Sequence, residues 1–108
     1  MWGLGSGPFE VRTDFVGRAA TVTVCGEIDI CTSPRLRAKL FRAVEMGAER
    51  LVVDLTDVVF IDASGLGVFA QVVRCLSRPG QVIVRSPTPF VFRAFELTGM
   101  DGVCLIQR

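Results

Sequence analysis

A near-continuous apolar run at residues 51–55 leads, through the segment FIDASGLG at residues 60–67, into a second apolar stretch at residues 68–76. The first run is typical of a strand that is covered on both faces of a sheet, whereas the second has the length and pattern of a helix. The segment between them therefore predicts a strand-to-helix turn. Ser64 would then lie in the first helical turn, where free backbone N–H groups and the helix dipole favour an anion such as a phosphate.

Strand and helix patterns alternate along the chain. Strands are expected at residues 9–14, 19–25, 51–55, 81–84 and 103–106. Helices are expected at residues 34–46 with a cap at Thr32 or Ser33, from Ser64 to a stop at residues 78–80, and at residues 89–98 with a cap at Thr88. The link at residues 15–18 contains a glycine, so the first two strands are expected to form a hairpin. The later alternation predicts right-handed crossovers and parallel strands.

The expected fold is therefore an α/β domain with a mixed, mostly parallel sheet of about five strands, flanked by about three to four helices. Residues 9–108 are expected to form this single domain, and residues 1–8 are expected to be a flexible N-terminal lead-in. A chain of 108 residues suffices for one domain with its own core.

The helix after Ser64 is apolar on two sides. At about 100° per residue, one face collects the residues that are expected to face the core: Leu66, Phe69, Ala70, Val73 and Leu76. The opposite side, near Ser64, has Val68, Val72 and Cys75, although a surface helix is usually polar there. Either another part of the domain covers Val68 and Val72, or these valines belong to a protein-docking surface, since apolar patches often mark interfaces.

Charge and hydropathy exclude several classes of function. The net charge is only +1, with acidic and basic residues intermixed. No basic cluster resembles a phosphate-tracking surface, so direct nucleic-acid binding is not expected. No apolar run reaches membrane-spanning length, and the start of the chain lacks the pattern of a signal peptide. We therefore expect no membrane insertion and a cytoplasmic location.

Cysteine spacing and the absence of histidine bear on the chemistry. Cys25 and Cys104 lie in apolar strand-like runs and are expected to be buried, whereas Cys31 and Cys75 are expected nearer the surface, where a redox role stays open. None of the four forms a C-x-x-C pair and the chain has no histidine, so no metal site is expected. Ser64 also lacks a histidine base. The sequence therefore predicts neither an enzyme nor a bound cofactor.

Four segments resemble, in order and spacing, the STAS domains of bacterial anti-sigma factor antagonists. They are GEID at residues 26–29, VDL at 53–55, FIDASGLG at 60–67 and LTGMD at 97–101. The resemblance covers about residues 9–107 and implies a STAS-type fold. Members of this family commonly have a second serine where this chain has Ala63, so Ser64 is the residue of that turn to which a phosphate is assigned.

The resemblance implies a partner-switching cycle. The unphosphorylated antagonist binds an anti-sigma factor that is also a serine kinase, and the sigma factor is thereby released. The kinase then uses ATP to phosphorylate the serine that matches Ser64, the complex dissociates, and a serine phosphatase restores the antagonist. The protein would be a ligand and a substrate, and not an enzyme.

Individual roles follow for the residues around Ser64. Asp29 matches a position that contacts the partner, or else it caps the following helix. Asp62 is expected to cap the Ser64 helix rather than to contact the kinase. Gly65 and Gly67 let a partner backbone approach closely, or they only permit a tight turn.

Aspartates are expected to make the docking edge acidic. Asp29 and Asp57 follow neighbouring strands and are expected near Ser64 and Asp62. A phosphate with a charge of about −1.5 to −2 at pH 7 would then weaken partner binding by repulsion. Thr56 is a second candidate phosphosite. An alternative function is that of a STAS scaffold in a sensory complex, or of an accessory subunit of a lipid-transport ATPase.

Overall fold

The computed structural model describes residues 8–76 and 81–108. The lead-in expected at residues 1–8 lies, apart from Pro8, outside the described residues, as does the helix stop expected at residues 78–80. Within the described part of the chain, no helix combines the length and the apolar character needed to cross a membrane.

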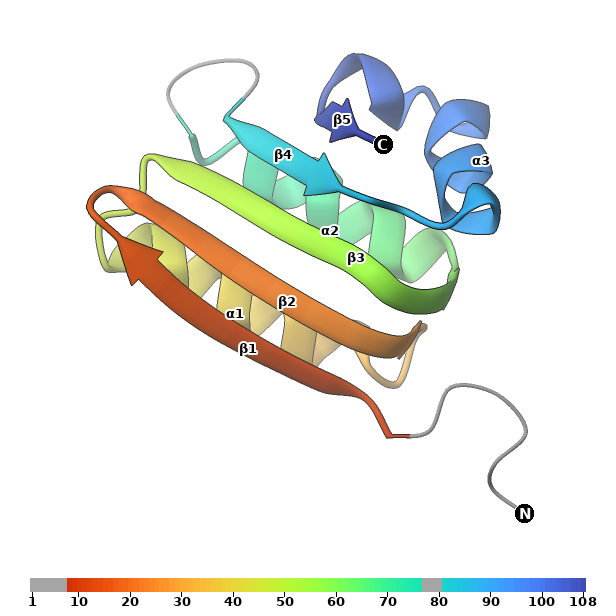
Figure 1. The fold of residues 1–108 in the computed structure, drawn as a ribbon, viewed down its shortest axis with the longest axis horizontal. Helices are drawn as coiled ribbons and strands as arrows, with labels where there is room; N and C mark the ends of the chain where they lie inside the picture. Colours follow the sequence, from red (N-terminus) through yellow and green to blue (C-terminus); the bar gives the residue numbers. More distant parts are fainter. Residues whose placement is uncertain (1–7, 77–80) are drawn as a thin grey trace.

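Strands and helices alternate in this part of the chain in the order that the sequence predicts. The strands are β1 (Glu10–Val16), β2 (Ala19–Ile28), β3 (Arg50–Ile61), β4 (Val82–Arg85) and β5 (Leu105–Gln107); the helices are α1 (Ser33–Glu45), α2 (Ala63–Val73) and α3 (Pro89–Leu97), with a short 3-10 helix, η1 (Met100–Gly102), before β5. The sheet has the order β1-β2-β3-β4-β5, with β1 antiparallel to β2 and every other pair parallel (Figure 1). The predicted α/β fold is thus confirmed.

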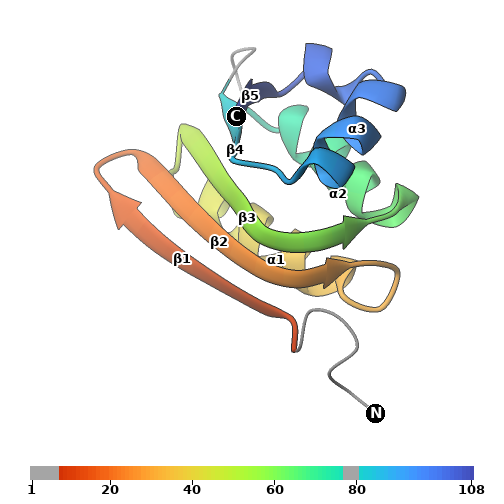
Figure 2. The ribbon, with the colours of Figure 1, turned by 45° about the vertical axis from the view of Figure 1, so that its right-hand side comes forward.

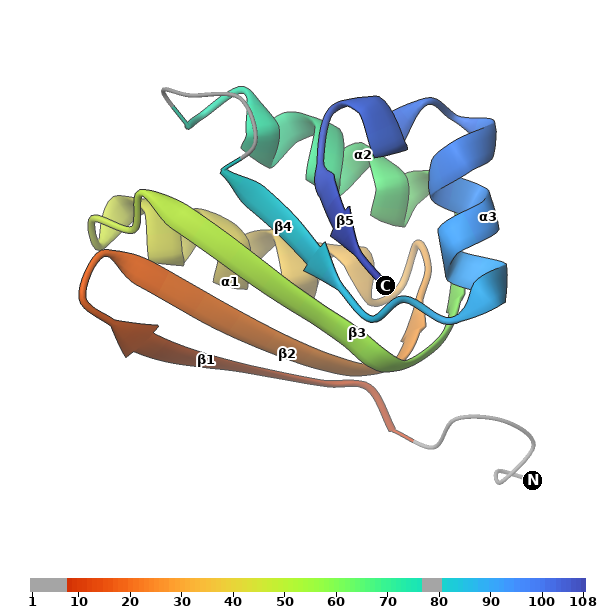
Figure 3. The ribbon, with the colours of Figure 1, turned by 45° about the horizontal axis from the view of Figure 1, so that its top comes forward.

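The helices lie mainly on one face of the sheet. Helices α1 and α2 lie behind β2 and β3 in Figure 1, while α3 lies at the end of the sheet away from β1 (Figure 2). In β2, the fully buried Ala20, Val22 and Val24 alternate with the half-buried Thr21 and Thr23. Because strand side chains alternate in direction, one set of β2 side chains points toward the helices and the other set points to the opposite face of the sheet. We call this opposite face the helix-free face; in Figure 3 the strands lie in front of α1.

Strand β3 is longer than the predicted residues 51–55. It continues to Ile61, because residues 57–61 still pair with β2 after a register shift near Cys25 and Gly26. Thr56 and Asp57 are exposed at this irregularity, and these polar residues interrupt the apolar pattern by which the strand was predicted. The extension brings the end of the strand to within three residues of Ser64.

Helix α2 is buried on both of its apolar sides. Val68 is 5% exposed and Val72 is fully buried, because α1 packs alongside α2 and contributes Leu40 to the same core. The Phe69 ring packs edge-on against the Phe95 ring of α3, with centroids 5.2 Å apart. The expectation that Val68 and Val72 lie on an exposed docking surface is therefore wrong, and the alternative, that the domain itself covers them, is correct.

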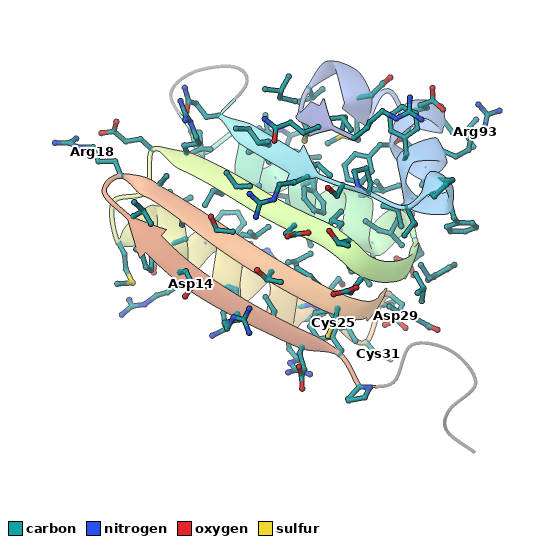
Figure 4. All side chains as sticks on the ribbon, in the orientation of Figure 1. Asp14, Arg18, Cys25, Asp29, Cys31 and Arg93 are labelled. Atoms are coloured by element: carbon teal, nitrogen blue, oxygen red, sulfur yellow. The ribbon has the colours of Figure 1, made fainter. Side chains whose placement is uncertain are left out.

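The cysteines follow the predictions with one exception. Cys31 and Cys75 are exposed, and Cys104 is buried; burial raises the pKa of the Cys104 thiol to about 11. Cys25 was expected to be buried and is only half-buried, because it follows the inward-facing Val24 and points to the helix-free face of the sheet (Figure 4).

Candidate functional site

Asp62 joins β3 to α2 and caps the helix. Its backbone is extended, with φ −112° and ψ −172°, and its Oδ1 accepts hydrogen bonds from the backbone N–H groups of Ser64 at 2.9 Å and Gly65 at 3.2 Å. These two N–H groups are among those that a helix leaves without internal partners. A capping side chain of this kind stabilises a protein by about 1 kcal/mol. The predicted capping role of Asp62 is confirmed.

The Ser64 hydroxyl donates a hydrogen bond to the same oxygen of Asp62, at 2.5 Å. This bond, together with the backbone N–H donors, holds the pKa of Asp62 below its ordinary value. The ionised carboxylate therefore contributes its full stabilisation above the ordinary pKa, and the contribution is lost as the pH falls through the lowered value. Ser64 is half-buried. Since its hydrogen is directed at Asp62, the lone pairs of Oγ are left for an incoming group.

The turn between β2 and α1 lies directly beside this cap. Asp29 Oδ1 accepts hydrogen bonds from the backbone N–H groups of Cys31 at 2.9 Å and Thr32 at 3.0 Å, and Figure 4 shows Asp29 and Cys31 where β2 leads into α1. The Asp62 backbone N–H donates to the Ile28 carbonyl at 3.1 Å, and Ile28 pairs with Ile61 in the parallel sheet. The predicted proximity of Asp29 and Asp62 is thus explained by the pairing of Ile28 with Ile61, the residues that precede them, and by the hydrogen bond from Asp62 to Ile28.

Asp29 stabilises the turn and is not the cap of α1. Thr32 occupies the N-cap position, but its side chain makes no capping bond and its hydroxyl donates instead to the Glu27 carbonyl at 2.7 Å. The alternative role for Asp29, as the cap of α1, is therefore wrong: its carboxylate holds the turn that precedes the helix. Its contact with a partner remains a prediction.

Gly65 and Gly67 have opposite surroundings. A Cβ atom at Gly65 would lie 2.6 Å from Cγ2 of Ile28 and 2.8 Å from Cγ1 of Ile61, so Gly65 is required for close packing of α2 on the sheet. Gly65 is buried and has no surface for a partner backbone. A Cβ atom at Gly67 would meet nothing within 4 Å. Of the two glycines, Gly67 is the one that a partner backbone could approach.

Asp57 and Thr56 do not belong to the site. Asp57 pairs with Cys25, whose side chain points to the helix-free face, and lines a hollow with Glu10 and Cys25. Ser64 lines a different hollow, between α1 and α2, so the expectation that Asp57 lies near Ser64 is wrong. The Thr56 hydroxyl, one residue before Asp57, donates to Asp54 at 2.6 Å. In residues 8–76 and 81–108, no three His, Cys, Asp or Glu side chains gather in a way that could hold a metal ion.

Two exposed apolar side chains, one in the turn beside the site and one at the start of α3, were not among the predicted residues. Ile30, in the turn that contacts Asp62, is 75% exposed, and Phe90, at the start of α3, is 56% exposed. The Phe90 ring stacks on Phe60, two residues before Asp62, with centroids 5.7 Å apart. The exposure of Ile30 could have been predicted, because an isoleucine in a turn between a strand and a helix has no core face to join. The position of Phe90 could not, because it depends on how α3 packs.

A mixed five-stranded sheet, helices stacked mainly on one face, and a capped serine at the start of α2 define an α/β domain of the STAS type. A family model described as "Mlab, STAS domain" matches residues 11–107, and the chain belongs to this STAS domain family.

Relatives and solved structures agree with this assignment. The anti-sigma-B factor antagonist of Bacillus subtilis (strain 168) is 34% identical to this chain over 83 residues, which cover 76% of this chain and 75% of the relative. A crystal structure of an anti-sigma factor antagonist from Mycobacterium paratuberculosis matches with a TM-score of 0.84 and 27% identity, over 93% of this chain and 86% of that one. SpoIIAA in its unphosphorylated form matches with a TM-score of 0.78 over 92% and 89% of the two chains; at 24% identity, this likeness concerns the fold alone.

Proposed function

We propose that this protein is an anti-sigma factor antagonist that is switched by phosphorylation of Ser64. In the unphosphorylated form it binds an anti-sigma factor that is also a serine kinase, and so frees a sigma factor for transcription in the cytoplasm. The kinase transfers the γ-phosphoryl group of ATP to Ser64 Oγ, with loss of the hydroxyl proton and release of ADP, and the complex separates. A serine phosphatase then restores the binding form.

The observation that carries this proposal is the Ser64 hydroxyl, held at the start of α2 by a 2.5 Å hydrogen bond to Asp62. A phosphate at this position is compatible with its own helix, because the N-terminus carries a partial positive charge. The relatives named anti-sigma-B factor antagonist support the proposal, since they match most of this chain.

Release follows from charge at the docking surface, which we define as Asp29, Ile30, Asp62, Ser64 and Gly67. The surface already has two carboxylates, and a phosphoserine adds a charge of about −1.5 to −2 at pH 7. Like charges brought together in an interface cost several kcal/mol, and each ~1.4 kcal/mol is tenfold in affinity. Phosphorylation is therefore expected to weaken binding by about a hundredfold without unfolding the domain.

Phosphorylation of Ser64 can be tested with purified candidate anti-sigma kinases from the same genome. Incubation with ATP and one of these kinases is expected to add one phosphate to the parent protein and none to Ser64→Ala, as measured by intact-mass spectrometry. Ser64→Ala should still capture the kinase and should resist release by ATP. Thr56→Ala is the matched control, because Thr56 is an exposed hydroxyl outside the docking surface, and it should gain the phosphate as the parent does.

A phosphate that persists in Ser64→Ala would contradict the assignment of the site. Failure of every candidate kinase to bind or modify the folded parent would favour the alternative function, a scaffold in a sensory complex or an accessory subunit of a lipid-transport ATPase. That role needs the STAS fold but no phosphoacceptor.

The docking surface can be tested separately through Ile30. Ile30→Glu should weaken kinase binding by about tenfold or more, because it replaces an exposed apolar contact with a charge at an acidic surface. Val16→Glu is the control: Val16 is 80% exposed but lies at the far end of β1. Calorimetric binding and thermal unfolding are measured for both. Equal affinities in the two variants would remove Ile30 from the proposed surface.

A further inference from the structure

A hollow of about 340 Å³ lies between α1 and α2, next to Ser64. Ser33, Pro34 and Arg37 line it from α1, and Ser64, Gly67 and Gln71 line it from α2. Both helices follow parallel strands, so their positive N-terminal ends lie at the same edge of the sheet. Among the residues that line the hollow, Arg37 is the one with a formal charge.

Arg37 has a neutral partner in this form of the protein. Its Nε donates to Gln71 Oε1 at 2.9 Å, and its guanidinium carbon lies 4.8 Å from the centroid of the Phe41 ring. Within residues 8–76 and 81–108, Arg37 forms no salt bridge. Arg37 and Gln71 are both exposed. The guanidinium can therefore exchange the amide for an anion without opening the core.

We infer that Arg37 binds the phosphate of phosphorylated Ser64, and that it leaves Gln71 to do so. This inference rests on the proposed function and adds to it an internal receptor for the phosphate. An arginine–phosphate pair joins two ionised groups and is frequently bidentate, whereas the present bond to Gln71 has one ionised partner and one neutral one. Gln71 lies about 10 Å beyond Ser64 along α2, and helical side chains lean toward the N-terminus of their helix. Arg37 and Ser64 line the same hollow, and the guanidinium turns from Gln71 toward the N-terminal end of α2 to meet the phosphate.

The carboxylates of Asp62 and Asp29 also favour movement of the phosphate toward Arg37. Phosphorylation removes the hydroxyl hydrogen that now binds Asp62 and places two negative groups together, while Asp29 lies in the adjacent turn. Repulsion from these carboxylates directs the phosphate away from the cap and into the hollow, toward Arg37. The exchange uncovers the Phe41 ring and frees the Gln71 amide. Phosphorylation thus changes the shape of the α1–α2 surface as well as its charge.

The test uses protein with phosphoserine inserted at position 64 during translation by an expanded genetic code, so no kinase is needed. The phosphate is titrated by ³¹P NMR, where a free phosphoserine has its second pKa at about 6. Arg37 lowers this pKa and the two carboxylates raise it. Arg37→Gln is therefore expected to raise the titration midpoint by about 0.5 pH unit, a shift reduced from that of a buried pair by solvent screening.

Two further variants make the result specific to the arginine. Lys39→Gln removes a positive charge from the same helix but outside the hollow, since Lys39 lines a different one beside Val11, and it should leave the midpoint unchanged. Arg37→Lys keeps the positive charge and should therefore keep the midpoint close to that of the parent. In ¹⁵N spectra, the Arg37 Nε–H signal should also move between the unphosphorylated and phosphorylated proteins.

Equal midpoints in the parent, Arg37→Gln and Lys39→Gln, with an unmoved Arg37 Nε–H signal, would overturn the inference. That outcome would leave the proposed partner switch intact, because release by charge repulsion does not need Arg37. A kinase screen that never modifies Ser64 would count against the proposed function and would not affect the titration. The two failures are therefore distinguishable.

Discussion

Val72→Glu is expected to lower the melting temperature by about 15 °C or more, or to abolish cooperative unfolding altogether. Val72 of α2 is fully buried in the hydrophobic core, so the new carboxylate would have no water beside it. An unpaired buried charge costs several kcal/mol, a large part of the roughly 5–15 kcal/mol that holds a domain folded. In a domain of this size each kcal/mol corresponds to about 4–8 °C. Thermal unfolding followed by circular dichroism measures the effect.

Cys75→Glu is the matched control for this substitution. Cys75 lies three residues further along and is exposed, so the same new charge should shift the melting temperature by only about 3 °C. Burial raises the pKa of a glutamate, and its destabilising effect should therefore decrease as the pH falls through that raised value. If Val72→Glu instead melted like the parent at neutral pH, the side of α2 that faces α1 would have to be accessible to water. That result would contradict the burial of Val72 and would support a docking surface at Val68 and Val72.

The order of the elements was predictable because it depends on local patterns. Alternation in β2 and the proline and glycine positions around the helices determine where elements begin and end within a few residues. The two apolar sides of α2 show the limit of such patterns. Periodicity indicates that Val68 and Val72 are apolar and on one side, but only the packing of α1 against α2 shows which surface is covered.

The candidate site was predictable where a residue acts on its own neighbours in the chain. Asp62 caps the helix that begins one residue later, and this followed from a carboxylate placed just before Ser64 and the helix. Asp57 was misplaced because its side depends on the register shift between β2 and β3, which no local pattern records. The pairing of Arg37 with Gln71 was not foreseen either, since it joins residues 34 positions apart through the packing of two helices.

The glycines of the Ser64 turn provide the second large prediction. Gly65→Ala is expected to destabilise the domain by about 1–3 kcal/mol, because its Cβ would overlap Ile28 and Ile61 and force a shift of α2. The obstructing atoms belong to branched side chains that are 0% and 3% exposed, so they have no free space into which to move. The corresponding fall in melting temperature is about 5–20 °C.

Gly67→Ala is the internal control, since it makes the same chemical change two residues later in the same helix. Its Cβ meets nothing within 4 Å, and alanine is a better helix former than glycine by about 1 kcal/mol, so the melting temperature should stay the same or rise. Kinase binding should instead be weaker in Gly67→Ala than in Gly65→Ala. Gly67→Ala adds a methyl group at the docking surface, whereas Gly65 is buried. Equal stability of the two variants would contradict the close packing of α2 on Ile28 and Ile61. A loss of binding confined to Gly67→Ala would show that the partner backbone approaches the first turns of α2, where Ser64 presents its hydroxyl.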